Sequence, residues 1–186
     1  MAAPTYLLDA NSSSKPKHPK PITYLLDANV FIEAARRYYA FDLAPGFWDS
    51  LIQHAANGRI MSIDRVKDEL DKSKDALADW ANKNFRSAFH STDDEGIIQT
   101  YGRIMAWVQS QAQFLDAAKS DFAAGADGWL VACARVKGHI VVTHEVPARD
   151  ARRRVPIPNV CEAFGVRWVD TFVMLRSLGV RFGTAP

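Results

Sequence analysis

Residues 23–35 read TYLLDANVFIEAA, and this stretch decides the fold class. Its apolar run, 24–26, is typical of a short buried strand in a parallel sheet. Apolar residues at helical spacing start at Val30 and predict a helix that continues to about Tyr39. A strand that ends on an acid and passes directly into a helix presents that acid at the carboxyl edge of a parallel sheet. Asp27 is therefore the first candidate site residue.

The heptapeptide TYLLDAN also occurs at residues 5–11, where the cationic, proline-rich segment SSSKPKHPKP follows it. Because such a segment cannot continue a packed element, residues 1–21 are predicted to form a flexible tail. The duplication is too short to indicate a repeat architecture. An alternative is that the first copy pairs along an exposed sheet edge, in this molecule or another. The folded domain is predicted to span residues 22–186.

Composition narrows the class of protein. The chain has 186 residues, of which 48% are hydrophobic and 24% charged, as expected for one globular domain with a core of normal size. A net charge of +2 is too small to indicate a nucleic-acid-binding protein by itself. Two cysteines do not make a disulfide framework, which favours the reducing cytoplasm.

The sequence gives no sign of a membrane partner. The amino terminus lacks the basic-then-apolar pattern of a signal peptide. No apolar run approaches the roughly 20 residues that are needed to cross a bilayer. We therefore expect a cytoplasmic protein without a membrane-bound segment.

Strands are predicted to alternate with helices along the rest of the chain. Further apolar strands are expected at 59–63, 139–143 and 166–169. Helical periodicity fills the intervals between them, with predicted helices at 45–57, from 64, from about 75, from 95 to about 108, 114–125, 127–138, 160–164 and 171–178. This alternation predicts an α/β fold in which helices cover both faces of a central parallel sheet, giving a three-layer α/β/α sandwich.

Four acids stand at the boundaries of these predicted elements. They are Asp27 after the first strand, Glu69 on the helix after the second, Asp127 at the start of the helix before the third, and Glu145 after the third. The carboxyl ends of parallel strands share one edge with nearby helix starts, so the four acids are expected to line one cleft. Clustered carboxylates repel one another, and a divalent cation relieves that repulsion.

The chemistry of this cleft favours a hard metal ion. Mg²⁺ and Mn²⁺ prefer oxygen ligands, and Asn29 and Thr143 add neutral groups near the same edge. One or two such ions can activate water and stabilise the charge on a phosphodiester during hydrolysis. The sequence has no cysteine and histidine spacing for zinc, no G-x-x-x-x-G-K-[ST] phosphate loop and no G-x-S-x-G elbow.

This constellation resembles the PIN-domain family, in particular toxins of the VapC type. The segments that carry the resemblance are YLLDANVFIEA at 24–34, SIDRVKDEL at 62–70, ADGWLVACA at 126–134 and VVTHE at 141–145. Their order and spacing match over most of residues 22–180. The chain looks most like a subgroup with Glu as the last acid, where Asp is commoner, so the Glu145 carboxylate is displaced by one methylene.

The resemblance implies a PIN-like three-layer fold and a Mg²⁺- or Mn²⁺-dependent endoribonuclease that cuts single-stranded or exposed RNA. It implies a toxin with a cognate antitoxin that blocks the cleft, and homodimers are frequent among such proteins. Carried over position by position, the catalytic and metal-site acids are Asp27, Glu69, Asp127 and Glu145. The supporting groups are Asn29 and Thr143.

A basic cluster follows the third predicted strand, in the loop from Pro147 to Pro158. It consists of Arg149, Arg152, Arg153 and Arg154. Arginines of this kind position RNA through its phosphates and do not read its sequence. The alternative is a solvated loop whose arginines pair with nearby acids.

Each acid also has a purely structural interpretation. Asp27 and Asp127 would both suit the N-cap position of a helix, and Glu145 would suit an ordinary loop. Glu69 would suit a surface ion pair with Arg65, four residues earlier. Two further acids compete for the same places, Asp68 beside Glu69 and Asp121 six residues before Asp127.

Two other functions compete with the nuclease interpretation. One is a non-catalytic PIN-like module whose cleft holds RNA or a protein without cutting. The other is a phosphatase of the haloacid dehalogenase type, which also begins with an acid at a strand end. That family requires a second Asp two residues later, where this chain has Asn29, and no Gly-Thr follows. His144 is assigned no catalytic role, and most of the tryptophans are expected in the core.

Overall fold

A five-stranded parallel sheet forms the centre of the computed structural model, which describes residues 21–182. The strand order is β3-β2-β1-β4-β5, and every neighbouring pair is parallel. The strands are β1 (Tyr24–Leu26), β2 (Ile60–Ile63), β3 (Phe89–His90), β4 (Ile140–Val142) and β5 (Trp168–Val169). The predicted tail, with the first TYLLDAN copy, lies outside the described residues apart from Pro21.

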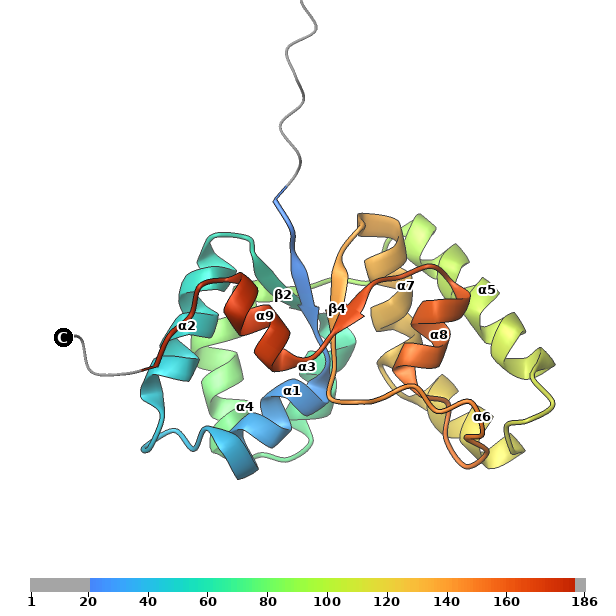
Figure 1. The fold of residues 1–186 in the computed structure, drawn as a ribbon, viewed down its shortest axis with the longest axis horizontal. Helices are drawn as coiled ribbons and strands as arrows, with labels where there is room; N and C mark the ends of the chain where they lie inside the picture. The colour runs from blue at the N-terminus through green and yellow to red at the C-terminus, as the bar shows by residue number, and fades with distance from the viewer. Residues whose placement is uncertain (1–20, 183–186) are drawn as a thin grey trace, which may run out of the picture.

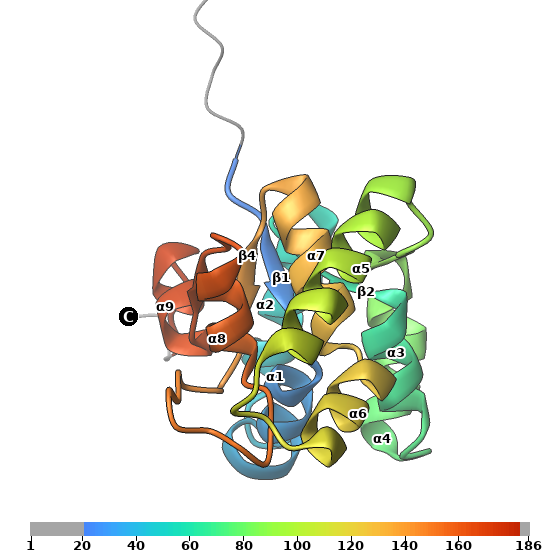
Figure 2. The ribbon, with the colours of Figure 1, turned by 90° about the vertical axis from the view of Figure 1, so that its right-hand side faces the viewer.

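Helices form the two outer layers. Figure 1 shows α2, α4 and α9 on one side of the sheet and α5, α7 and α8 on the other, and Figure 2 looks onto the second layer, where α5 packs along α7. The helices are α1 (Ala28–Glu33), α2 (Pro45–Ala56), α3 (Asp64–Asp71), α4 (Ala76–Trp80), α5 (Glu95–Ser110), α6 (Asp116–Ala124), α7 (Asp127–Lys137), α8 (Ile157–Ala163) and α9 (Thr171–Ser177). Two π-helical turns, η1 (Ala34–Tyr38) and η2 (Ala81–Phe85), and a 3₁₀ turn, η3 (Arg86–Ala88), extend α1 and α4.

The core is built around β1, which has a strand on each side and a helical layer on each face. Tyr24, Leu25 and Leu26 are all buried, because a central parallel strand meets apolar neighbours on both faces. Phe31 on α1 is fully buried and meets Phe85 edge to face, with ring centroids 5.4 Å apart. Burial of this apolar run fixes where β1 ends and therefore where Asp27 stands.

The order of the strands reverses beside β1. The chain passes from β1 outward to β2 and β3, and then returns to add β4 and β5 on the other side. Ligands of open parallel sheets bind at this kind of switch point, outside the carboxyl ends of the strands. Asp27 follows β1 and Thr143 follows β4, and the Asp27 amide donates a hydrogen bond of 3.0 Å to the Val142 carbonyl.

The predicted three-layer α/β sandwich with a central parallel sheet is confirmed. The fifth strand, β3, is not among the predicted elements. The alternative in which Asp127 caps its helix is wrong. Asp127 is the first helical residue of α7, and the cap position is held by Ala126, which makes no side-chain hydrogen bond. None of the described helices is long and apolar enough to span a membrane.

Candidate carboxylate site at the switch point

Asp27 is a buried carboxylate held by one neighbouring hydroxyl. Its side chain is 2% exposed, and Thr143 Oγ1 donates a hydrogen bond of 2.9 Å to Asp27 Oδ2. Its pKa is raised to about 6, chiefly by burial; the negative charges of Glu145 and Glu69 add to the rise, whereas the hydrogen bonds of Thr143 and the Asn29 amide oppose it. Although Asp27 occupies the N-cap position of α1, its side chain makes no capping hydrogen bond. Burial and the nearby acids therefore make the ionised form of the Asp27 carboxylate costly.

Asp127 is less buried and is less well paired. Within residues 21–182, no hydrogen bond or ion pair reaches its carboxylate, although it stands on the first turn of α7. Its pKa is raised to about 8, first by burial and then by the negative charges of Asp27, Glu145 and Glu69. A cation that enters the site would stabilise the ionised form of this unpaired carboxylate.

Glu69 connects α3 to the start of α7. Its Oε1 accepts a hydrogen bond of 2.9 Å from the Ala126 amide, directly before Asp127. The alternative pairing with Arg65 is not formed. Arg65 instead lies over the Trp129 ring, 4.4 Å from its centroid, and donates to the Thr92 hydroxyl. The competing acid beside Glu69, Asp68, is exposed on α3.

Glu145 is fixed by the arginine-rich loop. Its Oε2 accepts a hydrogen bond of 2.7 Å from the Ile157 amide, and its Oε1 lies 3.7 Å from Arg154 Nη1. Its own amide donates to Thr143 Oγ1 at 3.2 Å, so a single hydroxyl connects the backbone of Glu145 to the carboxylate of Asp27. The loop and the two acids are thereby held in one network.

Two cavities open beside Asp127 and Glu145, whereas Asp27 and Glu69 line neither of them. The smaller, ≈ 130 Å³, is lined by Asp121, Asp127, Glu145 and Arg154 together with Ala118, Phe122 and Val155. The larger, ≈ 430 Å³, is lined by Asn29, Glu33, Arg37, Tyr38, His144, Glu145, Val146 and Arg154. Both cavities have Glu145 and Arg154 in their linings, and we call the two together the acidic cleft. Its walls come from α1, α6, α7 and the loop after β4.

The negative charges of Glu69 and Glu145 raise the pKa values of both Asp27 and Asp127, so the four predicted acids lie within electrostatic reach of one another. Among the described residues, however, no three acidic, histidine or cysteine side chains stand close enough to hold one metal ion. Mg²⁺ is commonly bound through one or two carboxylates and several waters, so a tighter group is not required. An all-oxygen donor set that contains the unpaired Asp127 carboxylate fits such an ion.

The four arginines of the predicted basic cluster are all exposed, but only Arg154 lines the acidic cleft. All four line a further hollow of ≈ 590 Å³ within the loop 148–154.

Five residues that line the larger cavity are not among the predicted site residues: Glu33, Arg37, Tyr38, His144 and Val146. The signal for the first two was their spacing, because Asn29, Glu33 and Arg37 follow one another at intervals of four on a helix. Asp121, considered only as a competitor of Asp127, lines the same cavity as Asp127.

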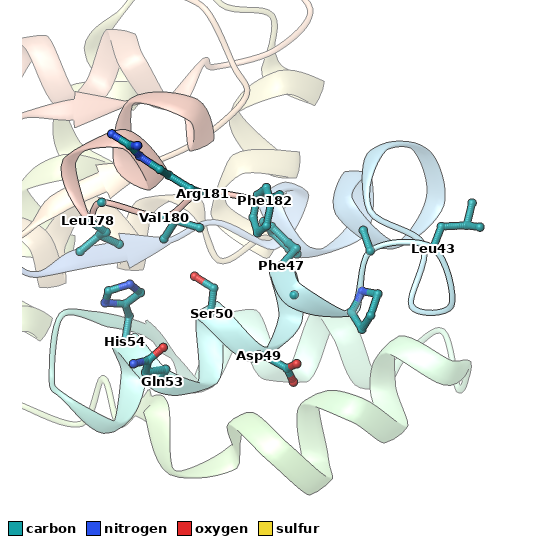
Figure 3. A pocket seen from close by; sticks show the side chains of 14 residues that line it. Leu43, Phe47, Asp49, Ser50, Gln53, His54, Leu178, Val180, Arg181 and Phe182 are labelled. Carbon is teal, nitrogen blue, oxygen red and sulfur yellow. The ribbon is translucent and has the colours of Figure 1, made fainter. Parts of the chain in front are cut away.

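A larger cavity, ≈ 690 Å³, lies elsewhere, between α2 and residues 178–182 (Figure 3). Phe47, Val180 and Phe182 give it an apolar lining, with Ser50 and His54 as polar groups on the α2 side. None of the predicted site residues lines this cavity.

The fold and the site define a parallel α/β protein with a carboxylate cleft at its switch point. The chain belongs to the family described as "Domain of unknown function (DUF4411)", which matches residues 24–182. No curated protein matches the sequence significantly. Among solved structures, VapBC2 from Rickettsia felis bound to a DNA fragment from their promoter is similar, with 14% identity and a TM-score of 0.48 over 80% of this chain and 98% of the other. A likeness of this degree supports no statement about function.

Proposed function

We propose that this protein is a metal-dependent endoribonuclease that hydrolyses RNA phosphodiester bonds, and that it is the toxin of a toxin–antitoxin pair. One observation carries the proposal: Asp27 and Asp127, with raised pKa values, gather with Glu69 and Glu145 at the strand switch point. Clustered carboxylates with perturbed pKa values are typical of functional sites. The resemblance of the four segments to PIN-domain toxins supports RNA as the substrate.

The residues that would hold Mg²⁺ or Mn²⁺ are Asp27 and Asp127, with Glu69 and Glu145 at their sides. Such an ion supplies activation of water and stabilisation of phosphate charge. The Thr143 hydroxyl orients the Asp27 carboxylate, and the Ala126 amide orients that of Glu69. These hydrogen bonds fix the carboxylates before a ligand arrives, which reduces the reorganisation that binding requires.

The exposed arginines of the loop after β4 support contact with RNA phosphates. Arg154 lines both cavities of the acidic cleft, where it offsets the charge of Glu145. Arg149, Arg152 and Arg153 extend the positive surface along the loop. Contacts of this kind position an RNA strand without reading its sequence, so binding should weaken as salt concentration rises.

The partners follow from the same proposal. An antitoxin would bind over the acidic cleft and exclude RNA from it, and a homodimer is a further expected assembly. Both expectations rest on the resemblance to VapC-type toxins, and the proposed location is the cytoplasm. Co-purification from the native host would identify the small protein and the RNA that accompany the chain.

Cleavage of RNA tests the proposal directly. Wild-type protein with Mg²⁺ or Mn²⁺ is expected to cut single-stranded RNA, and a chelator is expected to stop it. Asp27→Asn and Asp127→Asn should each reduce the rate by on the order of 100-fold or more, because each removes a charge from the proposed metal site. Asp68→Asn, an exposed change one residue from Glu69, is the matched control. Equal activity of the wild type and the two site variants would remove the proposal.

A second candidate is a PIN-like module that binds RNA or protein without cutting it. Two observations favour it: Glu69 and Glu145 already accept backbone hydrogen bonds, from Ala126 and Ile157. Calorimetry with Mn²⁺ separates the two candidates. The nuclease is expected to bind the ion and to lose this binding in Asp27→Asn, whereas the non-catalytic module is expected to show no binding in either form.

A further inference from the structure

We infer that Tyr38 and Arg37 form a nucleotide subsite in the larger cavity of the acidic cleft, where an unpaired RNA base stacks on Tyr38 and a phosphate contacts Arg37. This inference rests on the proposed function and deepens it. Both residues belong to η1, the π-helical turn that extends α1, and both line the larger cavity together with Asn29 and Glu145. The subsite would therefore adjoin the carboxylates.

Tyr38 offers an open aromatic ring. The residue is 55% exposed, and its two aromatic neighbours, Tyr39 and His144, are tilted against it with ring centroids 6.5 and 6.2 Å away. Neither neighbour stacks on the Tyr38 ring, so a flat group can reach it. A base bound to a protein as a single strand commonly stacks on an aromatic side chain of this kind.

The other aromatic rings beside the acids are already covered. Tyr39 stacks on Phe47 at 4.2 Å with an interplanar angle of 8°. Trp129, two residues after Asp127 in the first turn of α7, stacks on Tyr101 at 3.8 Å and also has Arg65 over its ring. Among the described residues that line the cleft, Tyr38 is thus the aromatic side chain suited to a base.

The charges around Tyr38 suit the backbone of a nucleic acid. Arg37 Nη1 lies 3.2 Å from Glu33 Oε2, and Arg154 Nη1 lies 3.7 Å from Glu145 Oε1. Both arginines are more than half exposed, and ion pairs of this kind are weak, so a phosphate can compete for either guanidinium. Two arginines and one open ring on the walls of a single cavity provide a phosphate contact and a stacking contact together.

The local backbone and the lining also favour a nucleotide over a protein segment. The Tyr39 amide bonds to the Ala34 carbonyl at 2.7 Å, which closes the wide π-helical turn beneath Tyr38, and turns of this type are frequent at functional sites. Apart from Tyr38 and Val146, the side chains that line the cavity are polar or charged. A docking protein would need more apolar surface at its centre than this lining offers.

Equilibrium binding of a fluorescein-labelled, single-stranded RNA oligonucleotide tests the subsite. The measurement uses the full chain with Asp27→Asn, so that cleavage does not interfere. Adding Tyr38→Ala is expected to raise the Kd roughly tenfold or more, the usual effect of losing a base–aromatic stack. Tyr38→Trp should restore binding because it keeps a flat ring. The same RNA annealed as a duplex should show no effect of Tyr38→Ala, since its bases are not free to stack.

Arg37→Ala tests the phosphate contact, and its neighbour Arg36 supplies the matched control. Arg36 is similarly exposed but does not line the cavity, and it pairs with Asp75 at 3.6 Å. Arg37→Ala is expected to weaken RNA binding and to reduce the dependence of log Kd on log salt by about 0.7. Arg36→Ala is expected to leave binding unchanged.

The subsite and the proposed function can fail separately. Unchanged RNA affinity in Tyr38→Ala, or equal weakening for single-stranded and duplex RNA, overturns the subsite even if the wild type cleaves RNA. Unchanged RNA affinity in Tyr38→Ala would indicate that this surface binds a protein partner and not RNA. Binding that depends on Tyr38 in a protein without Mg²⁺- or Mn²⁺-dependent cleavage supports the subsite and removes the nuclease. Circular dichroism of each variant shows whether its fold is intact.

Discussion

The Thr143 hydroxyl offsets part of the free-energy cost of burying the Asp27 carboxylate. It donates to the Asp27 carboxylate and accepts from the Glu145 amide, and Thr143 itself is buried. Thr143→Val removes both hydrogen bonds while nearly conserving shape. We expect it to lower the free energy of unfolding by about 1–3 kcal/mol, the cost of leaving a buried polar group without its partner. Urea unfolding measures the change, and Thr143→Ser, which keeps the hydroxyl, should recover most of it.

The raised pKa values of Asp27 and Asp127 predict how stability depends on pH. Both lie above the ordinary value of 3.8, at about 6 and about 8, so the folded chain binds more protons than the unfolded chain between roughly pH 4 and pH 8. Stability without metal should therefore fall as the pH rises through this range.

Asp127→Asn isolates one part of that dependence. Because the amide never ionises, the variant should match the wild type near pH 4 and exceed its stability by about 1–3 kcal/mol near pH 8.5. Melting in the presence of EDTA across this range is the measurement, with the exposed Asp68→Asn as a control. A constant difference in stability between Asp127→Asn and the wild type at all pH values would show that ionisation of Asp127 does not cause the loss of stability at high pH.

The strand-end argument places Asp27 and Thr143 from the sequence, because an apolar run fixes where a buried strand stops. The same argument brings Glu69 and Glu145 to that edge, and the catalytic roles of these residues stay predictions. Tyr38 could not be found in this way. Its exposure depends on a π-helical turn, whereas regular helical periodicity offers no reason to separate Tyr38 from its partly buried neighbour Tyr39.

At the scale of elements, the first turn of α7 depends on a glycine. A Cβ atom on Gly128 would lie 3.0 Å from Tyr101 Cε2 and 3.1 Å from Phe122 Cε1. Gly128→Ala is therefore expected to destabilise the protein by about 1–3 kcal/mol and to displace the turn that carries Asp127. Gly102 supplies the matched control within α5, because a Cβ atom there meets nothing within 4 Å. Gly102→Ala should stabilise by about 0.5–1 kcal/mol, and the same sign for both variants in urea unfolding would contradict the packing argument.

The elements that the sequence pattern missed are the short or irregular ones. β3 has only two residues, Phe89 and His90, and too little alternation to be recognised as a strand. It pairs with β2 because the turns η2 and η3 bring it there, which is a tertiary effect. The α1 pattern predicted a helix to Tyr39, and the chain does stay helical, but as a π turn after Glu33.

At the scale of the whole molecule, the acidic cleft predicts that divalent ions stabilise the fold. An ion that binds only the native state at 100 times its Kd adds about 2.7 kcal/mol, which corresponds to a rise in Tm of roughly 5–10 °C for a chain of this size. Mn²⁺ and Mg²⁺ should raise the Tm at pH 7, with Ca²⁺ and Na⁺ as controls. Asp27→Asn and Asp127→Asn should abolish the rise, and an unchanged wild-type Tm would count against a metal site.

The central strand has a consequence for synthesis on the ribosome. β1 is complete only when β2 and β4 flank it, and the partner of Asp27 lies 116 positions later in the chain. Translation delivers the amino-terminal part first, so a nascent polypeptide holds its acids apart until β4 has left the exit tunnel. A product truncated at residue 139 is therefore expected to show no cooperative melting and no response to Mn²⁺. Polypeptides released early from damaged messages would be inert, and only full-length translation would yield the working arrangement.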